Sequence, residues 1–103
     1  MKKVIGCKLY DSGKARRIYV WHSGHKPGDH RHAIEVLYKS AKGAWFIHGE
    51  GGPLTRFRRK IGDEFLSGED ILPLSPKEAL AWLEEHNGHE AAVREFGDLI
   101  EEA

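Results

Sequence analysis

The stretch Ser75-Pro76-Lys77-Glu78 most constrains the fold of this chain, because it has the form of a capping box at the start of a helix. The Ser75 side chain can accept the Glu78 amide, the Glu78 side chain can reach back to the Ser75 amide, and Pro76 stands at the first helical position, where no donor is lost. The sequence before this point has the two-residue period of strands. The sequence after it has the spacing of helices.

Two amphipathic helices are predicted from residue 75 onward. In the first, apolar residues share one side at helical spacing, and Asn87-Gly88 supplies a left-handed stop. The second runs from about 89 to 102, with an apolar arc opposite an acidic one. The apolar sets are Ala79, Leu80, Trp82, Leu83 and His86 in the first helix and Ala92, Val93, Phe96, Leu99 and Ile100 in the second.

The first predicted strand covers residues 4–10, where Ile5, Cys7 and Leu9 share one side at the two-residue period. A turn follows, and we expect a second strand over residues 15–22 to pair with the first as a short hairpin. Cys7 is the only cysteine, so no internal disulfide is possible. Its place on the core face predicts an inert, buried thiol.

The clearest predicted β-hairpin joins residues 33–39 to residues 44–49, with Gly43 at a positive φ in the connection. The basic segment that follows has no clean period and predicts irregular chain, with a short strand or helical turn near Phe57. Residues 70–74 can add a short edge strand, because the proline within them lacks an amide hydrogen.

These elements predict one α+β domain over residues 1–103, with an antiparallel β-sheet of four to five strands followed by two C-terminal amphipathic helices. The strand-rich part, 1–74, is basic and the helical part, 75–103, is acidic. Residues 1–60 carry fourteen Lys and Arg against four Asp and Glu, whereas residues 61–103 carry two against twelve. The chain is therefore a dipole in sequence, although its net charge is zero.

The composition, 40% hydrophobic and 31% charged, is that of a globular protein rather than a disordered one. The first residues include lysines but no apolar run of the kind found in signal peptides, and no stretch is apolar enough to cross a membrane. We therefore expect a cytoplasmic protein in a reducing compartment.

The segment WHSGHKPGDHRH, residues 21–32, gathers four histidines and an aspartate. Its Gly and Pro residues predict a loop. Zinc needs three or four converging donors, and the spacing of His22, His25, His30 and His32 resembles none of the usual ligand patterns. A solvated loop without a metal is favoured, with a metal site as the alternative. Protonation at mildly acidic pH would make such a loop positive.

No enzyme signature emerges from the sequence. Nucleophilic catalysis needs a nucleophile beside a base, and a buried Cys7 does not provide one. HGEGG, residues 48–52, offers an acid and a base at a strand end. It lacks the spacing of a phosphate-binding loop and is typical of a glycine-rich turn. We expect a non-enzymatic protein that needs no cofactor.

A basic, aromatic sheet face is one candidate for nucleic-acid binding. Cations that contact phosphates beside rings that stack on bases are a known route to single-strand recognition. The candidate residues are Arg16, Arg17, Tyr19, Trp21, Arg56, Phe57, Arg58, Arg59 and Lys60. The acids of the second part oppose this function unless they lie on the far side. The two helices could equally cover Tyr19 and Trp21.

The acidic helices indicate the opposite kind of partner. A rigid negative surface can be steered to a basic groove that normally holds nucleic acid, and can occupy it. The candidate contact residues are Glu84 and Glu85 on the first helix and Glu95, Asp98, Glu101 and Glu102 on the second. The alternative is a solvated face that contributes solubility alone.

Two stretches carry a resemblance to known proteins: LYKSAKGAWFIHGEGGPLTRF, residues 37–57, and ILPLSPKEALAWLEEH, residues 71–86, together about a third of the chain. They resemble small accessory proteins of phages and mobile elements, a class that includes anti-CRISPR inhibitors. The resemblance implies a protein that binds a Cas protein or its complex without chemistry. It carries over no functional residue, and the basic first part departs from a uniformly acidic DNA mimic.

We therefore expect a phage or mobile-element protein that inhibits a defence complex in the bacterial cytoplasm. The expected partner is a CRISPR–Cas effector subunit, bound through the acidic helices. A nucleic-acid-binding accessory protein that uses the basic sheet is the alternative, and a structural or regulatory protein of a mobile element is a third. The sequence leaves the oligomeric state open.

Overall fold

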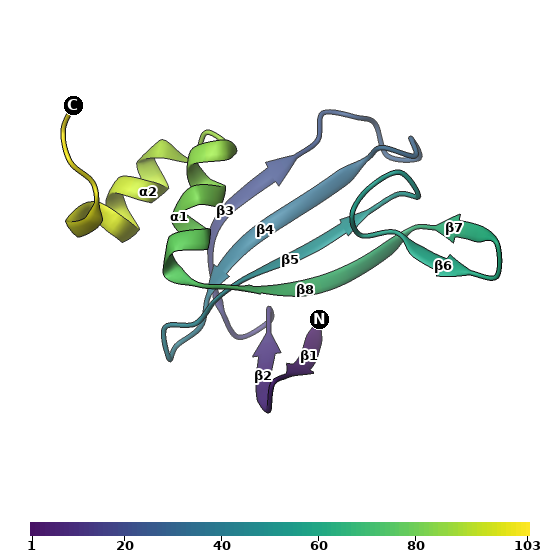
Figure 1. Cartoon of the computed structure of the whole chain (residues 1–103), viewed down its shortest axis with the longest axis horizontal. Coiled ribbons are helices and arrows are strands. Elements are labelled where there is room, and N and C mark those ends of the chain that lie inside the picture. Colours follow the sequence, from purple (N-terminus) through teal and green to yellow (C-terminus); the bar gives the residue numbers. More distant parts are fainter.

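The computed structural model describes all 103 residues and has a four-stranded antiparallel sheet at its centre, in the order β3-β4-β5-β8 (Figure 1). The central strands are β3 (Arg16–His22), β4 (Ala33–Lys39), β5 (Trp45–Gly51) and β8 (Gly68–Leu74). Two separate hairpins pair β1 (Lys2–Ile5) with β2 (Lys8–Asp11) and β6 (Arg59–Ile61) with β7 (Glu64–Leu66). The helices are α1 (Pro76–Glu85), α2 (His89–Phe96) and a short 3-10 helix, η1 (Gly97–Leu99). The predicted α+β class is confirmed.

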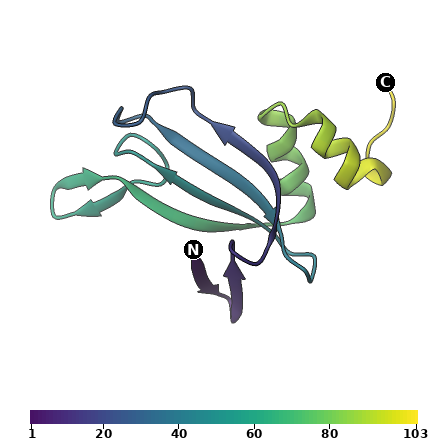
Figure 2. The same cartoon turned by 180° about the vertical axis from the view of Figure 1, so that it is seen from behind.

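The molecule is elongated, with principal extents of 47 × 33 × 19 Å. The two helices lie at one end of the long axis, and the β6–β7 hairpin projects from the other end (Figures 1 and 2). The β1–β2 hairpin lies below the sheet in both views. The helical part of the chain is thus separated in space from the β6–β7 hairpin.

The main core lies between one face of the sheet and the two helices. Side chains alternate along β5, so Trp45 and Ile47 join this core while Phe46 lies on the opposite face. Burial of such apolar side chains is the main source of folding free energy. The core residues are Ile18, Leu37, Trp45, Ile47, Phe57, Ala79, Trp82, Leu83, Ala91, Ala92 and Phe96.

One charged side chain belongs to this core. Glu35 of β4 is only 6% exposed. Its carboxylate accepts a hydrogen bond from Trp82 Nε1 at 2.9 Å and two from the Arg56 guanidinium at 2.5 and 3.1 Å. A buried carboxylate is tolerated when partners of this kind satisfy it. Glu35 therefore joins β4, helix α1 and the segment after β5.

A smaller core lies on the opposite face of the sheet. The fully buried Phe46 ring contacts the rings of Tyr10 and Tyr38, with centroid distances of 5.5 and 5.4 Å. Lys3 of β1 forms an ion pair of 2.5 Å with Asp70 of β8. The β1–β2 hairpin is thus fastened to the sheet by one aromatic contact and one ion pair.

The predicted start and end of helix α1 are confirmed. The Ser75 hydroxyl accepts the Glu78 amide at 3.1 Å, and the Glu78 carboxylate accepts the Ser75 amide at 2.8 Å. Asn87, just beyond the helix, has the left-handed φ of 61° that was predicted for the stop. Local capping chemistry therefore determines both ends of α1.

Helix α2 is shorter than predicted, and its packed face includes only Ala92 and Phe96 of the predicted apolar arc. It ends at Phe96, and Val93 and Leu99 are each 62% exposed. The packed face consists of Ala91, Ala92 and Phe96, whose ring lies 4.8 Å from that of Trp45. Small alanine side chains allow this close approach. The predicted apolar arc was therefore wrong at Val93, Leu99 and Ile100, which is 39% exposed.

The prediction of a single strand over residues 4–10, paired with residues 15–22, is wrong. The chain reverses at Gly6 and Cys7, whose φ angles are 57° and 65°, so that β1 pairs with β2. Two left-handed residues in a two-residue connection match the twist of the flanking strands. As a result Cys7 lies in an exposed turn rather than in the core.

The predicted hairpin at residues 33–39 and 44–49 is confirmed, with Gly43 at a φ of 89°. The edge position of residues 70–74 is also confirmed, because β8 is the outermost strand of the sheet. Strand β5 continues to Gly51, two residues beyond the predicted end.

A second hairpin, β6–β7, lies where irregular chain was predicted. Its two-residue connection is Gly62-Asp63, with Gly62 at a φ of 60°. A Gly-Asp pair is a known signal for such a turn. Each strand is only three residues long, which is too short to show a period.

Candidate functional site

The glycines of HGEGG are explained by packing within the chain. A Cβ atom on Gly49 would lie 2.0 Å from the end of the Phe57 ring, and one on Gly52 would lie 2.6 Å from the His30 carbonyl oxygen. These glycines allow the segment after β5 to fold back over the sheet. The space beside these glycines is thus filled by other parts of the protein.

The histidine-rich loop is ordered by its own hydrogen bonds. His32 Nδ1 donates to the His25 carbonyl at 2.8 Å. Arg31 bonds to the Asp29 carboxylate through its side chain and its backbone amide, and these bonds lower the pKa of Asp29 to about 2. Asp29 is therefore a charged, partnered group at neutral pH.

The four histidines do not meet at one point. No three His, Cys, Asp or Glu side chains anywhere in the chain form a group that could hold a metal ion. His22 and His30 are exposed, and one nitrogen of His32 is already bonded to His25. The geometry gives no support to the metal-site alternative.

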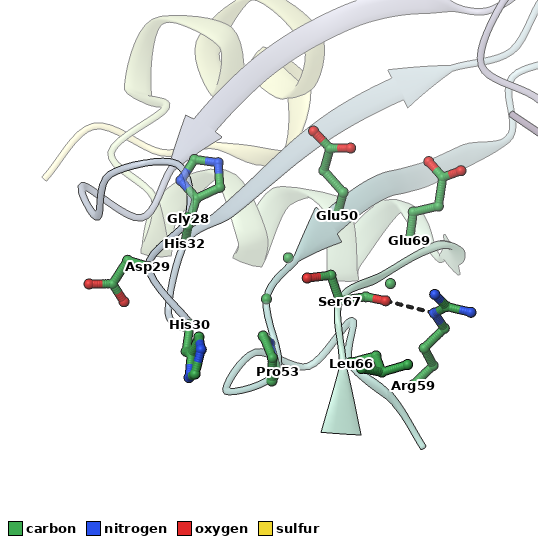
Figure 3. A pocket seen from close by; sticks show the side chains of 13 residues that line it. Gly28, Asp29, His30, His32, Glu50, Pro53, Arg59, Leu66, Ser67 and Glu69 are labelled. Atoms are coloured by element: carbon green, nitrogen blue, oxygen red, sulfur yellow. Dashed lines mark hydrogen bonds between the residues drawn. The ribbon is translucent and has the colours of Figure 1, made fainter. Parts of the chain in front are cut away.

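A hollow of about 870 Å³ opens between the histidine-rich loop, the end of β5 and the start of β8 (Figure 3). Its lining includes the carboxylates Glu50 and Glu69 together with the cation Arg59. Glu69 accepts a hydrogen bond from His48 at 3.0 Å, and Arg59 donates to the Ser67 carbonyl at 2.8 Å. The lining thus contains both acidic and basic side chains, several of which bond to other residues of the protein, and only one apolar residue. A typical small-molecule site has a mostly apolar wall instead.

The acidic candidates lie at the helical end of the molecule, and all but one are exposed. Glu84 and Glu85 belong to the last turn of α1. The later acids lie in η1 or directly after it. The exposed candidates are Glu84, Glu85, Asp98, Glu101 and Glu102, and we call them the acidic end. Glu90, near the start of α2, adds a further exposed carboxylate.

Glu95 does not belong to this open surface, which corrects the sequence prediction. Its side chain is 7% exposed and accepts hydrogen bonds from Arg16 at 2.8 and 3.2 Å and from Arg94 at 3.1 Å. The bonds from Arg16 hold the pKa of Glu95 below its usual value, and the single bond from Arg94 lowers it further, although burial opposes both effects. Glu95 anchors α2 to β3.

The aromatic residues of the predicted nucleic-acid face are packed against other parts of the protein. The Tyr19 hydroxyl donates to the His86 carbonyl at 3.1 Å, and the centroids of the Trp21 and His86 rings are 4.8 Å apart. Phe57 is buried above Gly49. Tyr19 and Trp21 are thus half-buried and Phe57 is buried, so the three rings do not form one open surface across the sheet.

The basic candidates divide into paired and unpaired groups. Arg16 bonds to Glu95 and Arg56 bonds to Glu35, so both are committed to the fold. The exposed candidates without a carboxylate partner are Arg17 on β3 and Arg58, Arg59 and Lys60 in or beside β6.

The structure adds a residue that the sequence prediction missed. Phe65 lies directly opposite Lys60 in the β6–β7 register and is 42% exposed. The Gly62-Asp63 turn signal could have placed the two side by side. Without it, Phe65 appears in sequence as an apolar residue of an irregular segment.

Comparison of the chain with protein-family models, curated proteins and solved structures finds no match. None of its helices has the length and apolar character needed to cross a membrane.

Proposed function

We propose that this protein acts without chemistry, by binding a protein of a bacterial defence complex through its acidic end. The observation that carries the proposal is the separation of charge in space. Exposed carboxylates gather on α1, η1 and the residues that follow, while the unpaired cations Arg58, Arg59 and Lys60 lie at the other end of the molecule, where the β6–β7 hairpin also carries Asp63 and Glu64.

The size of the molecule keeps these two groups from cancelling each other. At physiological ionic strength, dissolved salt screens charges over a Debye length of about 8 Å, whereas the long axis of the molecule is 47 Å. The acidic end therefore presents its own negative field to a partner. Such a field favours association with a positively charged groove.

The two helices of the acidic end are also held in place. The capping box fixes the start of α1, and the Glu35–Trp82 hydrogen bond ties that helix to the sheet. The Arg16–Glu95 pair ties α2 to β3. A prearranged surface loses less conformational entropy on binding.

The class of partner follows from the resemblance to anti-CRISPR proteins. Cas effectors hold a guide–target heteroduplex in a positively charged channel, which is the complement of a compact acidic surface. A Cas effector subunit is therefore the proposed partner, and the bacterial cytoplasm is the proposed place of action.

The test is affinity capture of the tagged protein from nuclease-treated lysates of bacteria that carry CRISPR systems, with retained proteins identified by mass spectrometry. Wild type is compared with Glu84→Lys/Glu101→Lys and with Glu50→Lys/Glu64→Lys, a matched reversal of two exposed acids elsewhere. We expect wild type and the matched control to retain a Cas subunit that the acidic-end variant loses. Equal retention of the Cas subunit by all three proteins would show that the acidic end is not the contact surface.

A further inference from the structure

The β6–β7 hairpin carries an exposed aromatic ring beside two cations. Lys60 and Phe65 are cross-strand partners, so their side chains share one face of the hairpin. The guanidinium carbon of Arg58 lies 4.0 Å from the centroid of the Phe65 ring, and Lys60 Nζ lies 5.8 Å from it. Phe65 nevertheless remains 42% exposed.

The charges on this face are not used by the fold. Neither Arg58 nor Lys60 forms a salt bridge with a carboxylate. Glu64 is opposite Ile61 in the register and so belongs to the other face of the hairpin. Most arginines of the chain differ in this respect, since a carboxylate partner is present for Arg16, Arg31, Arg56 and Arg94.

We infer that this face, formed by Arg58, Lys60 and Phe65, binds single-stranded nucleic acid. An unpaired base stacks on the open part of the Phe65 ring, and Arg58 and Lys60 each contact a phosphate beside that base. Unpaired bases expose the flat surface that such stacking needs, whereas duplex bases are already stacked on each other.

The other face of the hairpin is directed to the protein. Arg59 and Leu66 are cross-strand partners that line the hollow beside the histidine-rich loop. Arg59 is held there by its hydrogen bond to the Ser67 carbonyl. The face with Phe65 is therefore the free one, and Arg59 adds positive charge nearby.

This inference does not rest on the proposed function. The hairpin lies at the opposite end of the molecule from the acidic end (Figures 1 and 2). Binding of a protein at one end and of a strand at the other can therefore be tested separately.

The experiment is fluorescence anisotropy at low salt with labelled poly-dT and poly-rU of about fifteen nucleotides and a duplex of equal length. We expect wild type to bind both single strands more tightly than the duplex. Phe65→Ala should weaken binding about tenfold, because one base loses its stacking partner. Phe65→Trp should restore it. Leu9→Ala, which removes an even more exposed apolar side chain (62%) from the other hairpin, is the matched control and should have no effect.

Charge is tested in the same assay. Loss of two phosphate contacts in Arg58→Ala/Lys60→Ala should reduce the salt dependence of log K by about 1.4. Lys2→Ala/Lys8→Ala removes equal charge from the β1–β2 hairpin and should leave affinity within about twofold. Absence of binding at low salt, preference for the duplex, or equal losses in the two double variants would each overturn the inference. Circular dichroism of every variant checks that the fold is retained.

Discussion

At the scale of single residues, Glu35 and Gly49 have the widest consequences for the fold. Glu35 is the buried acceptor shared by Trp82 and Arg56. Gly49 provides the space that the Phe57 ring occupies. In the sequence, Glu35 is a polar residue in a strand and Gly49 is one glycine of a glycine-rich run. Their roles depend on partners distant in the chain, so local patterns did not predict them.

Glu35→Ala should lower the free energy of unfolding by about 3 kcal/mol, since it leaves the Trp82 N–H and the Arg56 guanidinium without their acceptor. Glu35→Gln keeps one acceptor oxygen and should be less destabilising. Urea unfolding at neutral pH measures both, with the exposed Glu50→Ala as the control. Equal stability of the Ala and Gln variants would contradict the assigned role.

Gly49→Ala should destabilise the protein by about 2 kcal/mol or more, because the added methyl group would overlap the Phe57 ring. Gly97→Ala is the matched control, since nothing lies within 4 Å of its added Cβ and its φ is −52°. In a Phe57→Ala background, Gly49→Ala should lower the free energy of unfolding by less than it does in wild type, and a double-mutant cycle measures this difference. An unchanged cost would show that the ring is not the obstacle.

At the scale of elements, local signals were reliable where they were strong. The capping box, Gly43 and the proline of β8 were placed correctly, because each acts through its own backbone neighbours. The β1–β2 turn was missed because Cys7, rather than Gly or Asn, takes one of its left-handed positions. The packed face of α2 was misassigned because the position of the sheet, and not helical periodicity, determines which residues are buried.

The exposed turn predicts the reactivity of Cys7. In the native protein its thiol should react with a disulfide reagent at a rate close to that of the urea-unfolded protein, because the turn leaves it open to solvent. A core cysteine would react only as fast as the protein opens. Strong protection of the native thiol would therefore contradict the β1–β2 hairpin.

The attachment of α2 predicts a pH dependence. The pKa of Glu95 is lowered in the folded protein by its hydrogen bonds with Arg16, so its contribution to stability is complete above its ordinary pKa and is lost as pH falls through the lowered value. Glu95→Gln should cost about 1–2 kcal/mol at pH near 7, and the difference from wild type should shrink below pH of about 4. Urea unfolding across this range tests it. A difference independent of pH would exclude the ion pair as the cause.

At the scale of the whole molecule, the sequence dipole is only partly a dipole in space, because the acids Asp63, Glu64, Glu69 and Asp70 lie on or beside β6–β7 and β8 rather than at the helical end. The order of charges along the chain indicated this possibility, but only the position of the helices relative to β6–β7 decides it. Two candidate surfaces changed on folding. Glu95 is not part of the exposed acidic surface, because it is paired with Arg16. The unpaired cations lie beside Phe65 on the β6–β7 hairpin rather than on the predicted face of the sheet. The partial burial of Tyr19 and Trp21 against the helices could not be predicted without the helix packing.

The most direct test of the central claim is a binding titration of the purified protein against purified Cas effector–guide complexes, with target DNA as competitor. The account predicts that wild type and Glu50→Lys/Glu64→Lys bind one complex and compete with its target. It also predicts that Glu84→Lys/Glu101→Lys binds at least tenfold more weakly, because its negative surface is reversed. Binding that is unaffected by reversal of the acidic end, or no binding to any complex, would contradict the account.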